Sequence, residues 1–131
     1  MIIDASGATV GRLASFVAKK ALGGEEISII NSEKAIITGN KKMIFEKYRT
    51  LRQKGGDAQK GPYFPRSPEQ ILKRIIRGMI PDHREGQGRM AFKRIKCYLG
   101  IPEEFKDKPI IKTAKPKRDP YVELKEVSQK I

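Results

Sequence analysis

The sequence is poor in the residues from which catalytic and metal sites are most often built. Among its 131 residues there is one cysteine, Cys97, and one histidine, His83. A single cysteine excludes an intramolecular disulfide, so nothing in the sequence requires an oxidising compartment. A structural zinc site takes several clustered Cys and His ligands, which two isolated residues do not supply. We therefore expect no metal and no cofactor, and we interpret Cys97 as a buried structural thiol in a strand.

Long apolar runs are also missing, and so is an acidic pair that suggests catalysis. No run approaches the roughly 20 apolar residues that span a bilayer. The opening Met1-Ile2-Ile3-Asp4 has neither the basic nor the apolar region of a secretory signal. The acidic residues are scattered and several adjoin a Lys or Arg, so no pair of them suggests acid–base catalysis. We expect a cytoplasmic, non-enzymatic protein with no membrane contact and no small-molecule substrate.

Positive charge is what the sequence has in excess. Lys and Arg total 28 against 15 acidic residues, a formal net charge of +13. Residues 1–40 carry no net charge, residues 41–96 carry +11, and residues 97–131 carry +2. A solubilising charge has no reason to concentrate in one segment. A binding face does, because clustered cations raise the local potential and release condensed counterions together. The sequence therefore predicts a nucleic-acid partner in preference to an anionic membrane.

Apolar periodicity in the first 40 residues predicts an α/β fold. Ile2-Ile3 and residues 27–30 are predicted to be buried strands, the second central in a sheet. Between them lies a helix that begins after Thr9 and stops at Gly23-Gly24. This order predicts a βαβ unit with a right-handed crossover and a parallel strand pair. A third short apolar stretch follows at residues 35–38.

The middle of the chain is predicted to be mainly helical. Residues 41–53 form a helix with an apolar stripe, and residues 54–66 form an irregular loop rich in Gly and Pro. A further helix begins at Ser67, which is predicted to form a capping box with Gln70. Its predicted buried stripe runs to Met79.

The rest of the chain is predicted with shorter elements. Residues 89–95 form a short basic helix and residues 96–99 a strand. The Pro-rich segment from about residue 101 is expected to be loosely ordered, and residues 121–131 to add a short extended piece and a final helix. The whole chain, 1–131, is predicted to be one domain because its length suits a single hydrophobic core.

The turn before the first helix invites comparison with phosphate-binding loops. Backbone amides at a helix N-terminus can hold a phosphate. The spacing from Gly7 to Gly11, followed by Arg12, fits neither the P-loop nor the dinucleotide-binding fingerprint. We favour the interpretation that Gly7 turns the chain and Gly11 lets the helix pack tightly on the sheet. The alternative is a nucleotide-dependent enzyme, which tight binding of ATP or NAD would support.

Basic residues beyond position 40 are the candidate RNA-binding residues. Tyr63 and Phe64 lie in an irregular loop between Lys60 and Arg66. There, aromatic rings can stack on splayed bases while cations bind phosphates. The alternative is that one of the two rings anchors the loop. Arginine suits such a surface because its fork binds phosphate oxygens bidentately. The candidates are Lys41, Lys42, Lys47, Arg49, Arg52, Lys54, Lys60, Tyr63, Phe64, Arg66, Lys73, Arg74, Arg77, Arg84, Arg89, Lys93, Arg94 and Lys96.

Four ordered blocks of sequence resemble the large-subunit ribosomal protein thirteen family. They are IDASG (3–7) with GRLA (11–14), NSEK (31–34) with ITG (37–39), RGMIP (77–81), and GRMAFKRIK (88–96) followed by Tyr98 and Gly100. Each block is modest alone, but together and in order they are specific. Residues 61–68 and the basic tail are similar to the archaeal and eukaryotic branch, and the short chain favours an archaeal-type member.

The resemblance carries expectations about fold and function. It implies a three-layer α/β/α fold around a small, mainly parallel, four-stranded sheet, in agreement with the βαβ order. It also implies a structural role in the large ribosomal subunit. That role is to bind the large rRNA, contact neighbouring ribosomal proteins and support early assembly, without enzymatic activity or metal. A repressor that binds mRNA would use the same basic surface, so this role is an alternative.

Overall fold

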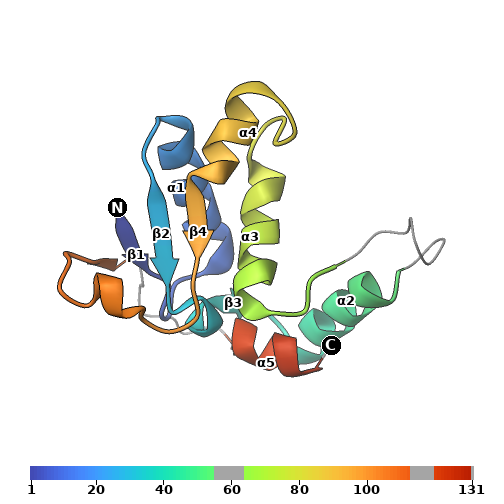
Figure 1. Ribbon diagram of the computed structural model, residues 1–131. Helices are drawn as coiled ribbons and strands as arrows, with labels where there is room; N and C mark the ends of the chain where they lie inside the picture. The colour runs from blue at the N-terminus through green and yellow to red at the C-terminus, as the bar shows by residue number, and fades with distance from the viewer. Residues whose placement is uncertain (55–63, 113–119, 131) are drawn as a thin grey trace.

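Short strands and helices follow one another along the chain (Figure 1). The computed structural model describes residues 1–54, 64–112 and 120–130. The elements are β1 (Ile2–Asp4), α1 (Val10–Leu22), β2 (Ile27–Ile30), the 3₁₀ turn η1 (Ser32–Lys34), β3 (Ile36–Thr38), α2 (Lys41–Gln53), α3 (Pro68–Met79), α4 (Gly86–Lys93), β4 (Ile95–Cys97), the 3₁₀ turn η2 (Glu103–Phe105), β5 (Ile111–Lys112), β6 (Tyr121–Glu123) and α5 (Leu124–Lys130).

Four parallel strands form the main sheet, in the order β4-β2-β1-β5. Ile3 lies opposite Ile29 of β2, and Ile29 in turn lies opposite Cys97 of β4. The pairing of β1 with β2 across α1 confirms the predicted βαβ unit. The central place of β2 is also as predicted, because both of its faces and both of its edges are covered.

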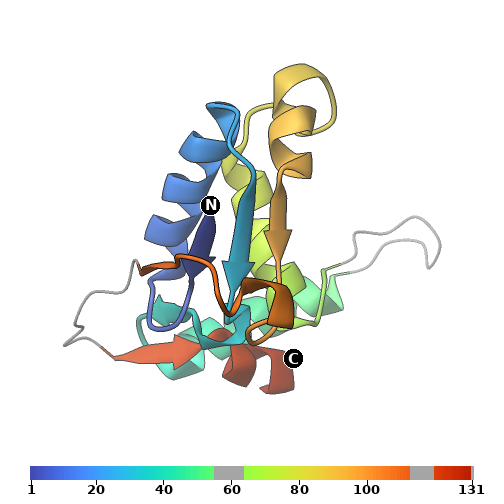
Figure 2. The same ribbon diagram turned by 60° about the vertical axis from the view of Figure 1, so that its left-hand side comes forward.

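Alternation along the strands gives this sheet two apolar faces. Ile3 and Ile29 are fully buried on the face covered by α1, α3 and α4. Ile2 and Ile30 point to the opposite face, where they pack with Phe105 of η2. Figure 2 shows α3 behind β2 and β4, and the η2 segment in front of them. The α/β class and the four-stranded parallel sheet are therefore confirmed, with one 3₁₀ turn as the thin third layer.

A second, two-stranded sheet lies at the carboxyl ends of the parallel strands (Figure 1). In it β3 pairs antiparallel with β6, so that Ile37 lies opposite Val122. The following helix, α5, buries Leu124 and Val127 and packs against α3 and α2. The small sheet and α5 thus join α2 to the rest of the protein. The predicted extended piece and final helix after residue 120 are confirmed by β6 and α5.

Polar side chains link the strand ends at this edge of the sheet. Asp4 Oδ1 accepts hydrogen bonds from the backbone N–H of Ser6, at 2.9 Å, and from Asn31 Nδ2, at 3.1 Å. Asn31 adopts a left-handed conformation with φ of 55°, and its N–H donates to the carbonyl of Gly100. Glu33 Oε2 in turn accepts from the N–H of Gly100 at 3.1 Å. Asp4 and Glu33 therefore hold neighbouring turns together, which gives the sequence blocks IDASG and NSEK a structural role.

The turn from β1 into α1 agrees only in part with its prediction. Gly7 has φ of 72°, a conformation that favours glycine, and its N–H donates to the carbonyl of Lys34 at 3.0 Å. Thr9 is the N-cap residue, although its side chain makes no capping hydrogen bond. The tight packing predicted for Gly11 is wrong. Gly11 is exposed, and a Cβ there would meet nothing within 4 Å among the described residues.

Two predictions about α3 are wrong. Ser67 is its N-cap, but the Ser67 side chain forms no capping hydrogen bond, so no capping box is present. Met79 is 42% exposed, because the chain leaves helical geometry at the next residue and turns Ile80 inward instead. The buried stripe of α3 consists of Ile71, Leu72 and Ile76.

The start of α4 also differs from its prediction. The helix begins at Gly86, three residues before the predicted 89–95, and β4 spans Ile95–Cys97 rather than 96–99. Glycine is a weak helix former, so the two glycines in the first turn hide the start of the helix. Gly88 lies there because a Cβ would overlap the backbone carbonyls of Pro81 and Asp82.

Candidate nucleic-acid interface

Helix α2 presents a row of cations to solvent. Ile44 and Tyr48 are buried and hold its inner face, as the predicted stripe requires. Several predicted RNA-binding cations of this helix are exposed, namely Lys41, Lys42, Lys47 and Arg49. Lys54, just after the end of the helix, is exposed as well. Figure 1 shows α2 extending away from the sheet, so these charges lie on a projecting arm.

The base of this arm is held by an aromatic and an arginine contact. Phe64 is half-buried, and its ring centroid lies 5.7 Å from that of Tyr48. Arg52 Nη1 donates a 2.7 Å hydrogen bond to the carbonyl of Phe64. The geometry of Phe64 favours the anchoring alternative for this ring, and Arg52 stabilises the chain path beside it. Lys60 and Tyr63 lie outside the described residues.

A second group of cations gathers on α3 and the turn before α4. Lys73, Arg74 and Arg77 are half-buried on α3, and Arg84 is exposed in the turn. The pKa of Arg77 is lowered, first by burial and then by the positive charges of Arg74 and Arg84. Three arginines that repel one another in this way form a local positive potential that an anion would relieve.

The remaining candidates divide between solvent and structure. Arg66, Arg89, Lys93 and Lys96 are exposed. Arg94 is different, because its Nη1 donates a 3.0 Å hydrogen bond to the carbonyl of Ala21. That carbonyl belongs to the last turn of α1, where a cation also interacts favourably with the helix dipole. The Arg94 side chain thus caps the C-terminal end of α1 and links it to the end of α4.

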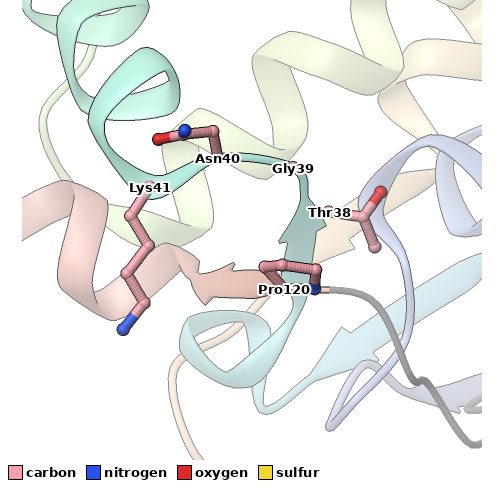
Figure 3. Close-up of a pocket in the computed structure, with 5 residues that line it drawn as sticks. All are labelled: Thr38, Gly39, Asn40, Lys41 and Pro120. Atoms are coloured by element: carbon pink, nitrogen blue, oxygen red, sulfur yellow. The ribbon is translucent and has the colours of Figure 1, made fainter.

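An open depression of about 520 Å³ lies where β3 meets α2 (Figure 3). Thr38, Gly39, Asn40, Lys41 and Pro120 line it. The side-chain oxygen Oδ1 of Asn40 already accepts a 2.9 Å hydrogen bond from the N–H of Lys42, because Asn40 is the N-cap of α2. Lys41 is the one cation among the described residues that line it, whereas three described cations line the pocket on α3.

The thiol of Cys97 behaves as a structural group. The residue is half-buried at the end of β4. Burial raises the pKa of its thiol to about 12, with a smaller opposing effect of Lys73 and a smaller raising effect of Glu69. The thiol therefore stays protonated near neutral pH and is a poor nucleophile.

Metal-binding clusters and membrane-spanning helices are both absent from the part of the chain that the structure describes. There, no three His, Cys, Asp or Glu side chains are grouped so that they could hold a metal ion. Within the same residues, no helix is long and apolar enough to cross a membrane.

A small α/β protein with a basic, mainly helical surface is the class that these observations define. The sequence profile described as "Ribosomal protein L13" matches residues 1–104. The chain therefore belongs to the ribosomal protein L13 family, which is a structural and non-enzymatic family. This result confirms the resemblance drawn from the four sequence blocks.

Curated relatives from archaea extend the match over nearly the whole chain. A protein of Archaeoglobus fulgidus named large ribosomal subunit protein uL13 is 46% identical over 134 residues, covering 98% of this chain and 85% of its own length. The protein of that name from Methanosarcina barkeri is 47% identical, over 99% of this chain and 96% of its own. The protein of that name from Methanococcoides burtonii is 51% identical, over 81% of this chain and 75% of its own length. The archaeal type expected from the sequence is confirmed.

Proposed function

We propose that this chain is a structural component of the large ribosomal subunit in the cytoplasm. It binds the large rRNA through the cations of α2, α3 and α4, contacts neighbouring ribosomal proteins, and supports early subunit assembly. The observation that carries the proposal is the concentration of +11 of the net charge in residues 41–96. Family membership and the names of the relatives support the ribosome as the setting.

The proposed interface has two parts with different geometry. The projecting α2 arm offers exposed lysines, which suit phosphates along a strand because each ammonium acts as a mobile point charge. The α3 and α4 surface offers arginines, whose forks bind phosphate oxygens in a fixed geometry. Contacts of this kind read the shape of folded RNA and the positions of its phosphates more than its base sequence.

The salt dependence of binding tests this proposal. If roughly 6–10 phosphates are contacted, affinity for a large-subunit rRNA transcript falls about 10³- to 10⁵-fold between 50 and 200 mM salt, on the scale established for duplex DNA. Filter binding or fluorescence anisotropy measures the change. An affinity that hardly changes with salt would contradict the proposal.

A pair of charge variants locates the interface. Replacing Lys41 and Lys42 by Ala removes up to about two phosphate contacts, so the slope of log affinity against log salt decreases by up to about two. The matched control replaces Lys106 and Lys125, which are also exposed but lie outside residues 41–96. The control is expected to leave the slope unchanged. Equal effects of both pairs would argue for non-specific attraction.

Sedimentation separates the ribosomal role from the alternative of messenger-RNA repression. The proposal predicts that the protein cosediments with large subunits and their precursors. The comparisons with relatives offer no support for the messenger role. Sedimentation with free messenger complexes alone would favour it.

A further inference from the structure

A shallow pocket between α3 and α4 combines charges with an aromatic ring. Its volume is about 250 Å³, and its lining residues are Pro65, Gln70, Lys73, Arg74, Arg77 and Phe92. The two arginines and the lysine come from consecutive turns of α3, whereas the ring comes from α4. Neither helix alone contains this combination.

Phe92 supplies a flat apolar surface, and its ring is contacted by Lys73 and His83. Lys73 Nζ lies 5.0 Å from the centroid of its ring. His83, in the turn before α4, lies 6.4 Å from it, centroid to centroid, with the ring planes inclined by 60°. The phenyl ring is half-buried, so part of it remains accessible. Its position is therefore fixed before any ligand binds, which lowers the entropy lost on binding.

The energies favour a base over the lysine as partner of this ring. A cation over an exposed aromatic ring contributes about 0.5–1 kcal/mol. A nucleobase stacked on an aromatic side chain contributes about 1–3 kcal/mol. A base can therefore displace the Lys73 ammonium group, which is then free to approach a phosphate.

The arginines supply the complementary site for a phosphate. Arg74 and Arg77 line the pocket, and Arg84 lies close enough to add to the repulsion on Arg77. Glu69, one turn before Lys73, is the nearby acid on α3, but it does not line the pocket. A phosphate beside Arg74 and Arg77 would offset the repulsion between them and accept bidentate hydrogen bonds.

We propose that this pocket binds one unpaired, splayed-out RNA nucleotide. The base stacks on Phe92, Arg74 and Arg77 bind its phosphate, and the amide of Gln70, which both donates and accepts, contacts the edge of the base. This inference rests on the proposed binding of rRNA and deepens it. It states that the α3 surface recognises a single-stranded nucleotide, whereas α2 binds only phosphates.

The test compares two phenylalanines in the full-length protein bound to a large-subunit rRNA transcript. Phe92→Leu keeps apolar volume but removes the stacking surface. Phe16→Leu is the matched control, because Phe16 is also partly exposed with a lysine, Lys20, 5.8 Å from its ring centroid. We expect Phe92→Leu to weaken binding by about 5- to 150-fold, from the stacking energy given above. The salt slope should not change, because no charge is removed, and Phe16→Leu should bind like the unmodified protein.

A second measurement does not depend on the folding of a variant. Ultraviolet crosslinking of the unmodified protein to the same transcript, followed by mass spectrometry, should give a nucleotide adduct at Phe92 and none at Phe16. Salt-sensitive binding without an adduct at Phe92, and with full affinity of folded Phe92→Leu, would overturn the nucleotide pocket and leave the proposed function intact. Failure of the unmodified protein to bind the transcript would overturn both.

Discussion

Gly88 shows how one residue fixes the junction between two parts of the proposed interface. It lies in the first turn of α4, where the backbone carbonyls of Pro81 and Asp82 approach its Cα too closely for a side chain. The turn that carries Arg84 is thereby packed against the helix that carries Phe92. Local helix propensity disfavours glycine here, so the reason for it is this tertiary contact.

Replacing Gly88 by Ala is therefore expected to destabilise the protein. The added methyl group has to displace backbone atoms, and overpacking of this kind typically costs about 1–3 kcal/mol in the free energy of unfolding. Gly11→Ala is the control, because Gly11 is also helical but faces open space. Alanine at Gly11 is expected to stabilise the protein by up to about 1 kcal/mol. Urea denaturation of the RNA-free protein measures both, and equal stabilities of the two variants would refute the packing argument.

Arg52 and Arg94 show that residue type alone does not reveal whether an arginine binds RNA or stabilises the fold. As charges in a basic segment they are indistinguishable from their neighbours. The structure gives each a carbonyl partner, on Phe64 for Arg52 and on Ala21 for Arg94. The partner of Arg94 lies far away in the sequence, so only the folded chain separates a capping arginine from one available to RNA.

At the scale of elements, the two best-defined helix starts of the middle segment are capped differently. Asn40 accepts a hydrogen bond from the N–H of Lys42 at the start of α2. Ser67 occupies the equivalent position of α3, but its side chain makes no such bond. The start of α3 depends instead on Pro68, which is preorganised for the first helical position.

This difference predicts unequal effects of one substitution at the two caps. Asn40→Ala is expected to cost about 1 kcal/mol of stability, because an N–H at the start of α2 loses its partner. Ser67→Ala is expected to change stability by less than about 0.5 kcal/mol. Thermal unfolding followed by circular dichroism measures the two variants side by side. A larger loss for Ser67→Ala would show that the caps have been assigned the wrong way round.

Local signals made several elements predictable. The bounds of α2 follow from its apolar stripe between Asn40 and the glycine-rich segment, and β1, α1 and β2 follow from periodicity and from turns such as Gly7. By contrast, the pairing of β3 with β6 and the addition of β5 beside β1 join segments far apart in the sequence. Strand pairs of this kind are determined by long-range contacts, which apolar patterns do not encode.

For the whole molecule, charge is divided between a neutral body and a basic periphery. The parallel sheet and α1 are built largely by residues 1–40, which carry no net charge. Most of the cations of residues 41–96 belong to α2, α3 and α4. The sequence predicted this division because charge counts need no tertiary information. The nucleotide pocket was not predictable, since it forms only where Phe92 of α4 meets the arginines of α3.

We propose above that residues 41–96 form the RNA-binding surface of a ribosomal structural protein. The most direct test is protein–RNA crosslinking in intact large subunits, with the crosslinked peptides identified by mass spectrometry. We expect most adducts to fall on α2, α3 and α4 within residues 41–96, at the exposed cations and at Phe92. Adducts concentrated in residues 1–40, or a protein absent from purified large subunits, would contradict it.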